Sequence, residues 1–300
     1  MKTVIKITII FLLLLWLFYD IDWYLFFTSL QHLNIIGIIL TFLTVFFSDI
    51  IISYRWYYLG LFRYSFLTSL EANMLAFFLN IFAPAKLGDL SKIYYLHKKE
   101  SAKIKDVTAM FLIERFFDVI ILGFLILFST LFIYPEPKAY ILVIFIAFIT
   151  LIFFYLLLQP KRFYRLLQII PWRKLRLSLY QIYKSLQSFM NIKKIVILTL
   201  LSLAVWGGYY LNNFVFFTLA TDFHLTFSQI FIASTLAFAV SAIPITPGGI
   251  GTFQAAFVLV LGWYGIPKES ALSASIVLQF LYILPATLYS IYLFMTKEFL

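Results

Sequence analysis

The stretch IFIASTLAFAVSAIPITPGGIGTFQAAFVLVL, residues 230–261, decides the fold class. It is longer than the ~20 apolar residues that a helix needs to cross a bilayer. Pro244, Pro247 and the glycines up to Gly251 interrupt it in the middle. A non-helical backbone survives at membrane depth only against protein or water. The pattern therefore predicts a re-entrant hairpin inside a membrane protein.

The composition excludes a water-soluble globule. Of the 300 residues, 63% are apolar and 12% charged, against about 45–50% and about 25% in ordinary soluble domains. The 36 Phe, 20 Tyr and 6 Trp are typical of lipid-facing helices with interfacial aromatic belts. The net charge of +10 comes from residues between apolar runs, which favours membrane orientation over nucleic-acid binding.

Metal and thiol chemistry find little support in the sequence. There is no Cys, and the three His lie far apart. We therefore expect no metal site, no cofactor and no thiolate nucleophile.

Six stretches have the length and apolarity of membrane-spanning helices. They are Val4–Tyr19, Asn34–Tyr54, Val107–Ile133, Ala139–Leu158, Ile195–Ala220 and Ser270–Met295. The first resembles a signal peptide but offers no small-residue cleavage site, so we expect it to be retained. A shorter stretch, Leu70–Ala83, runs into Pro84 and predicts a second re-entrant hairpin.

The basic residues predict the orientation of these segments. They follow the second span, the first hairpin and the fourth span, and cytoplasmic loops carry such an excess. All three groups are cytoplasmic if the N-terminus is, and if the two hairpins enter from opposite sides. The expected protein is thus all-α, with six spans, two opposed re-entrant hairpins and both termini on the inner side of the cytoplasmic membrane. Residues 160–194 predict basic amphipathic helices on the inner leaflet, or simply a charged connector.

Short matches suggest an internal repeat within a single membrane domain, residues 1–300. In order, they are Leu75-Ala-Phe77 with Leu236-Ala-Phe238, Pro84-x-x-x-Gly88 with Pro247-x-x-x-Gly251, and Lys99-Glu-Ser-Ala102 with Lys268-Glu-Ser-Ala271. The half-repeats would cover residues 1–133 and 139–300. Because their hairpins open to opposite sides, the repeat is inverted, which is a transporter architecture.

Three charged residues lie inside the third span: Glu114, Arg115 and Asp118. At 1.5 Å per residue, Asp118 is roughly 16 Å past the start of the span and near the middle of the bilayer. Each such charge costs about 2.5–3.5 kcal/mol on insertion scales, so ionisable residues at this depth favour a functional site. Arg115 can reach Asp118 at i+3. The alternative is a self-neutralising trio that only locks helices together.

The two hairpins supply further candidates for substrate binding. In the first hairpin, proline and glycine leave backbone amides available for a ligand, and lysine can hold a phosphate. The candidates there are Asn80, Pro84, Lys86, Gly88, Asp89 and Lys92. In the second, a glycine-rich break precedes a helix whose N-terminus favours an anion: Pro247, Gly248, Gly249, Gly251 and Gln254. The simpler interpretation of both is a turn, with inside-positive charge in the first. We expect Asp49 to pair with Arg55, and Asn212 and Asn213 to form helix–helix hydrogen bonds.

Enzymatic signatures are weak, and we expect no catalytic residue. The sequence has no Gly-x-Ser-x-Gly and no His-Glu-x-x-His. The acidic pair Asp20 and Asp22 follows the first span, where polyprenyl-sugar-dependent membrane glycosyltransferases hold a metal. That activity is one alternative, and a non-catalytic membrane scaffold is another.

The three motifs resemble the lysylphosphatidylglycerol synthase transmembrane family, which includes the flippase half of the bacterial multiple peptide resistance factor. They are Asn80-x3-Pro84-x-Lys86-x-Gly88-Asp89, Glu114-Arg115-x2-Asp118 and Pro244-x2-Pro247-Gly-Gly-Ile-Gly251. The sequence departs from the family at Lys86, Asp89, Gln254 and Gln279, where Arg, Glu, an acid and Arg are the commoner residues. The resemblance implies a flippase that moves an anionic or aminoacyl-modified phospholipid, without the soluble aminoacyl-transferring domain. Membrane lipids are then the expected partners, and a homo-oligomer or a separate lipid-modifying enzyme stays open.

Overall fold

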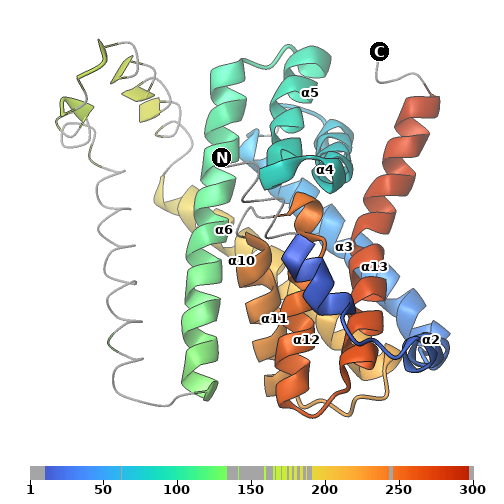
Figure 1. Cartoon of the computed structure of the whole chain (residues 1–300). Coiled ribbons are helices and arrows are strands. Elements are labelled where there is room, and N and C mark those ends of the chain that lie inside the picture. The colour runs from blue at the N-terminus through green and yellow to red at the C-terminus, as the bar shows by residue number, and fades with distance from the viewer. Residues whose placement is uncertain are drawn as a thin grey trace. The chain divides into compact units, whose positions relative to one another are not determined.

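A computed structural model describes residues 11–61, 63–133, 191–242 and 246–296 continuously, with scattered residues between 141 and 187. Within these ranges the chain is helical and contains no strand, so the all-α expectation is confirmed. Figure 1 shows the helices, which are α2 (Trp23–Gln31), α3 (Ile35–Leu59), α4 (Phe66–Phe82), α5 (Ser91–Glu100), α6 (Ile104–Ile133), α10 (Ile192–Val215), α11 (Phe227–Ala242), α12 (Thr252–Trp263) and α13 (Lys268–Met295).

Three described helices are long and apolar enough to cross a membrane. They are Ile35–Leu59, Ile192–Ala220 and Lys268–Met295, and they match three predicted spans. The third predicted span lies within α6, which carries the three charged residues expected at membrane depth. The predicted span Ala139–Leu158 and most of residues 160–194 lie outside the described residues.

Both predicted hairpins contain a helix, a short 3-10 helix and a second helix. In the first, η1 (Pro84–Leu90) separates α4 from α5. In the second, η3 (Pro247–Gly249) lies between α11 and α12. Proline stands at the start of both 3-10 helices, where its missing N–H costs no hydrogen bond. The breaks are thus where the sequence puts them, and the re-entrant path through a membrane stays a prediction.

The chain forms two compact units. Unit 1 comprises Met1–Ile50, Leu70–Ser91 and Val205–Leu300, and unit 2 comprises Ile51–Ser69 and Lys92–Ala204. These boundaries differ from the expected half-repeats, residues 1–133 and 139–300, which therefore stay a prediction about the sequence. Each unit is described by itself.

Small residues pack the helices of unit 1 closely. α11 lies along α12, α12 along α13, and α13 against α2 (Figure 1). Ala233, Ala237, Ala271 and Ala274 are completely buried in this core. In lipid the hydrophobic effect adds little between helices, so close backbone approach and van der Waals contact supply most of the association.

The start of α3 is fixed by a cap and a tight contact in unit 1. The side chain of Asn34 accepts hydrogen bonds from the backbone of Ile36 and Gly37 at 2.8 and 3.3 Å. A Cβ atom on Gly37 would lie 2.3 Å from the carbonyl of Leu219, so only glycine fits there. The cap and the contact together set where α3 meets the end of the apolar helix Ile192–Ala220.

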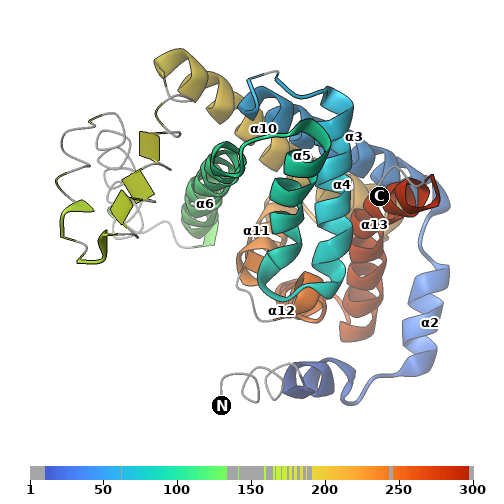
Figure 2. The same ribbon diagram turned by 90° about the horizontal axis from the view of Figure 1, so that it is seen from above.

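The N-terminal region is an elbow of two helices, and the first of them, Phe11–Phe18, lies within the predicted span Val4–Tyr19. The helix Phe11–Phe18 meets α2 at 82° (Figure 2), and α2 itself was not predicted. Asp22 caps α2 by accepting from the backbone N–H of Leu25 at 3.1 Å, which fixes the start of α2 after the turn. The ammonium of Lys268 donates to two carbonyls at the elbow, those of Trp16 at 2.9 Å and Tyr19 at 2.7 Å.

Unit 2 is built around α6. The buried apolar face of α6 includes Val107, Met110 and Ile113. It packs with Trp56 and Leu96, which come from α3 and α5. This core holds one face of α6 in a fixed orientation, and the same helix carries the charged residues.

Candidate functional site

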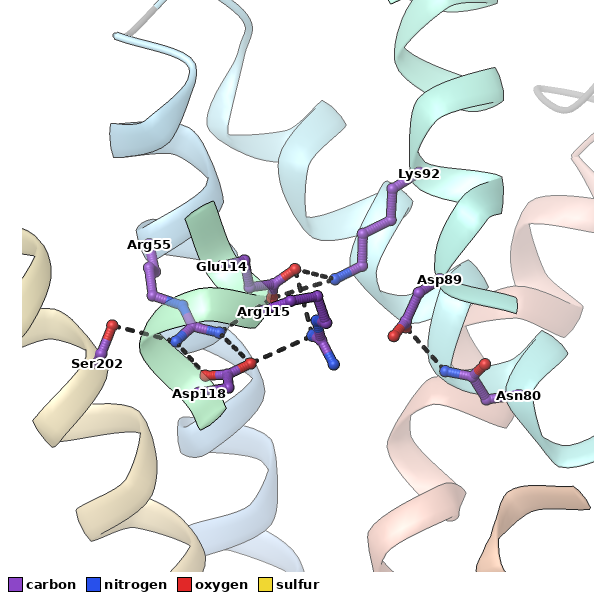
Figure 3. Close-up of polar contacts among 8 residues, drawn as sticks. All are labelled: Arg55, Asn80, Asp89, Lys92, Glu114, Arg115, Asp118 and Ser202. Carbon is purple, nitrogen blue, oxygen red and sulfur yellow. Dashed lines mark hydrogen bonds and ion pairs between the residues drawn. The ribbon is translucent and has the colours of Figure 1, made fainter. Parts of the chain in front are cut away.

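Five charged side chains form a cluster in unit 2, which we call the charged cluster (Figure 3). Its members are Arg55 from α3, Lys92 from α5, and Glu114, Arg115 and Asp118 from α6. Glu114 and Asp118 are one helical turn apart and face the same side. Charges from three helices therefore meet at one place.

Glu114 is the centre of the charged cluster. It is 1% exposed, and its carboxylate lies 3.0 Å from the Arg55 guanidinium, 3.2 Å from the Lys92 ammonium and 3.3 Å from the Arg115 guanidinium. A buried carboxylate is tolerated only when cations and hydrogen bonds replace the lost water. Glu114 thus holds three basic residues together.

Asp118 and Arg115 form the more open side of the charged cluster. Asp118 lies 2.7 Å from Arg55 and 3.3 Å from Arg115. Its side chain is 18% exposed and that of Arg115 is 33% exposed, whereas Lys92 is completely buried. A ligand would therefore meet Arg115 and Asp118 first.

The charged cluster carries more positive than negative groups. Three of its members are basic, Arg55, Lys92 and Arg115, and two are carboxylates, Glu114 and Asp118. The face of the Trp56 ring lies 4.6 Å from the Lys92 ammonium, and this cation–π contact stabilises the lysine without adding negative charge. A cluster in which basic side chains outnumber carboxylates suits an anionic ligand.

Sequence reasoning found most of this cluster and missed part of it. The structure brings Glu114, Arg115 and Asp118 together as expected, with the i+3 contact of Arg115 and Asp118 in place. Arg55 was expected only to pair with Asp49, but its guanidinium donates to Glu114, Asp118 and Ser202. The signal for Arg55 was its place at the end of an apolar span, where a charge is costly.

The structure also corrects the topology argument at two residues. Arg55 and Lys92 were counted among the basic residues of cytoplasmic loops, but both are buried in helices. Both side chains form ion pairs with Glu114, so their charge says little about orientation. The predicted orientation of the segments therefore depends on the remaining basic groups. The cytoplasmic position of the termini stays a prediction.

A second group of predicted site residues meets in unit 1, where η1 packs against η3; we call this contact the tip junction. Gly248 has φ +60°, and a Cβ on it would lie 3.3 Å from the Cα of Ile81. A Cβ on Gly88 would lie 2.5 Å from the backbone nitrogen of Asn80. Glycine is needed at both positions, at Gly248 for its backbone conformation and at Gly88 for space.

Amide side chains tie the tip junction to its neighbours. Asn80 donates to the buried carboxylate of Asp89 at 2.8 Å (Figure 3). Gln254 donates to Gln279 of α13, and Gln279 donates to the carbonyl of Gly248 at 3.0 Å. Gln254 also accepts from the backbone N–H of Gly251 at 2.7 Å, which fixes the start of α12. The second hairpin is therefore held by neutral hydrogen bonds.

The predicted site residues thus fall into two groups. Lys92, Glu114, Arg115 and Asp118 belong to the charged cluster of unit 2. The others belong to unit 1: Asn80, Pro84, Lys86, Gly88, Asp89, Pro247, Gly248, Gly249, Gly251 and Gln254. The side chains of Pro84 and Lys86 lie outside the described residues, so the expected phosphate contact of Lys86 stays a prediction.

Asp20 and Asp22 have local structural roles at the N-terminal elbow. Asp22 caps α2, and its backbone N–H lies 3.4 Å from Glu269. Asp20 has φ +57° in the turn of the elbow, a conformation that Asp adopts more readily than most residues. Among the described residues, no group of three or more His, Asp or Glu is placed to hold a metal ion.

Membrane-length helices, two broken hairpins and a buried charged cluster define an integral, polytopic membrane protein. The model of the lysylphosphatidylglycerol synthase transmembrane region matches residues 3–290, so the chain belongs to this family. It is also similar to UPF0104 membrane protein MJ1078 of Methanocaldococcus jannaschii, with 26% identity over 234 residues, 74% of this chain and 94% of the relative. No solved structure matches the chain.

Proposed function

We propose that this protein is a lipid flippase that moves an anionic or modified phospholipid between the leaflets of the cytoplasmic membrane. The observation that carries the proposal is the charged cluster, because it gathers three basic side chains and two carboxylates within a membrane helix bundle. Ionisable residues inside a membrane are costly, and they usually mark a substrate or ion pathway.

The chemistry of the charged cluster suits a phosphate group. The guanidinium of Arg115 is a third exposed and lies beside the partly exposed Asp118. Arginine binds phosphate oxygens with two parallel hydrogen bonds, and a phosphate can replace a carboxylate as its partner. We infer that a headgroup phosphate competes with Asp118 for Arg115 while Glu114 keeps Arg55 and Lys92 in place.

Family membership and the tip junction support the same proposal. Members of this family are named for the membrane region of a lipid-modifying enzyme, and this chain matches that region. Breaks in two hairpins that pack together are also a feature of transporters with a binding site near the midplane. Membrane lipids are the proposed partners, with no nucleic acid and no cofactor, and a separate enzyme would supply any modified lipid.

Leaflet exchange in proteoliposomes tests the proposal. Headgroup-labelled phospholipids would be reconstituted with wild type, Asp118→Asn and the control Asp222→Asn, an exposed aspartate of unit 1. We expect exchange of an anionic or aminoacylated lipid by wild type and the control, and at least a tenfold slower rate with Asp118→Asn. Equal rates for Asp118→Asn and wild type would contradict the role given to the charged cluster.

A further inference from the structure

The first helix of the elbow, Phe11–Phe18, lies against the break of the second hairpin in unit 1 (dark blue in Figures 1 and 2). Gly251 is the N-cap of α12, where the helix resumes after η3. A Cβ atom on Gly251 would lie 2.9 Å from Cδ2 of Leu13, so this leucine covers the start of α12. We propose that the helix Phe11–Phe18 is a lid over the second hairpin, which turns at the elbow and is held shut by Lys268.

The lid has few buried side chains. Within it, Leu17 is buried at 1% exposure and Leu13 is partly buried in the same core, while its other residues are exposed. Lipid tails are as apolar as leucine, so apolar side chains gain little by exchanging lipid for protein. Packing therefore contributes little to the attachment of the lid, and polar contacts have to hold it in place.

The polar contacts of the lid converge on Lys268, the first residue of α13. Its ammonium donates to the carbonyl of Trp16 at 2.9 Å and to that of Tyr19 at 2.7 Å. It also lies 5.6 Å from the centre of the Trp16 ring. The last carbonyls of a helix have no partner within the helix, and the helix dipole favours a cation there. One side chain of α13 thus caps the lid and fixes its position.

The turn between the lid and α2 has the features of a hinge. Asp20 has φ +57°, and the chain is not helical from there to Asp22. Beyond the turn, α2 is fixed to α13. The backbone N–H of Asp22 lies 3.4 Å from the carboxylate of Glu269, and the hydroxyls of Ser29 and Ser270 lie 2.9 Å apart. Because a short non-helical segment absorbs changes of φ and ψ, the lid can turn while α2 stays in place.

The lid controls the access of lipid to the second hairpin, and this part rests on the proposed function. When the lid is shut, Leu13 covers Gly251. When it is open, the first backbone N–H groups of α12, which have no partner within the helix, face the bilayer. Transport then requires the lid to open. Opening itself does not require transport and can be measured on the purified chain.

The chain has no cysteine, so a single introduced cysteine reports on the lid. Leu17→Cys is buried under the lid, and Phe26→Cys, at a buried position of α2, is the control beyond the hinge. The rate of reaction with N-ethylmaleimide is measured on the full chain in detergent. We expect Lys268→Met to raise the rate at Leu17→Cys about tenfold or more, because hydrogen bonds to a charged group are lost, and to leave Phe26→Cys unchanged. Lys193→Met, the same change at an exposed lysine of unit 2, should alter neither rate.

Two results of the labelling would overturn the lid. An unchanged rate at Leu17→Cys would show that Lys268 does not hold it shut. An equal rise at Phe26→Cys would show a general loosening of unit 1 instead of movement at the hinge. If Leu17→Cys does not fold, Leu13→Cys, at the contact with Gly251, gives the same comparison.

Cross-linking tests the control of access separately. Trp16→Cys and Lys268→Cys in one chain would be joined by a short bis-methanethiosulfonate reagent, which holds the lid shut through disulfide bonds. We expect lipid exchange in proteoliposomes to fall on cross-linking and to return on reduction, whereas the same reagent should not affect Trp16→Cys alone. Normal exchange by the cross-linked protein would overturn the control of access. Absence of exchange in wild type would count against the flippase, and the labelling result would still decide whether the lid opens.

Discussion

The two hairpins are followed by the same arrangement of residues with different chemistry. After η1, Lys92 of α5 contacts Glu114 of α6, 22 positions further along the chain. After η3, Gln254 of α12 contacts Gln279 of α13, 25 positions further along. Both contacts join the helix after a 3-10 break to the next long helix, but one is an ion pair and the other is a pair of neutral amides.

The difference shows that the link between these helices does not require charge. A pair of glutamines makes the same connection and also reaches the carbonyl of Gly248. The ion pair in unit 2 is therefore costly without being needed as a link. That cost is understandable if the charges serve a ligand, which is the role we propose for the charged cluster.

Replacing Glu114 by Gln makes the Lys92–Glu114 contact resemble the Gln254–Gln279 contact. Of the changes considered, it should lower the stability of the protein most. Glu114→Gln removes the carboxylate that Arg55, Lys92 and Arg115 share, while the shape stays the same. Leaving buried cations without their partner costs about 3–5 kcal/mol. Thermal unfolding in detergent should show a clearly lower midpoint, whereas Glu269→Gln, the same change at a partly exposed site, should not. An unfolding midpoint equal to that of wild type would mean that a neutral glutamine can link α5 and α6 as well as Glu114 does.

Removing the neutral contact between Gln254 and Gln279 should lower the stability of the protein by a smaller amount. Gln279→Leu leaves the Gly248 carbonyl and the Gln254 amide without their partner. Unsatisfied buried polar groups cost about 1–3 kcal/mol each, and leucine recovers part of this through packing. Urea or thermal unfolding against Gln31→Leu, at an exposed position of α2, would measure the loss. A loss as large as that of Glu114→Gln would show that the two contacts carry equal structural weight.

The smallest change in stability is expected at the open side of the charged cluster. Arg115 is a third exposed, and its ion pairs are partly screened by solvent. Arg115→Gln should therefore cost about 1 kcal/mol or less. Lipid exchange should fall at least tenfold in the same variant, because the group proposed to meet the phosphate is gone. Normal exchange would remove Arg115 from the pathway and point to Lys92 or Arg55.

The sequence predicts the helices and breaks well because apolar length and proline carry that information locally. It also predicts the contact of Arg115 and Asp118, which follows from helical spacing alone. It does not reveal that Arg55 and Lys92 join them, because such contacts depend on how separate helices pack. The end of the first helix was predicted close to where it lies, but α2 was not predicted. Asp22, which caps the start of α2, lies in a stretch whose apolar residues continue on both sides.

The tip junction has a consequence for how the protein is made. Gly248 packs against the backbone of Asn80 and Ile81, so the first hairpin reaches its final surroundings only after the second has been synthesised. Ribosomes add about 5–20 residues per second, which leaves the first hairpin without this contact for about ten to thirty seconds. During that interval the non-α-helical segment η1 is stabilised by the hydrogen bond between Asn80 and Asp89, without the contact with η3. Biogenesis of this protein thus includes a waiting period that a simple bundle of spanning helices does not have.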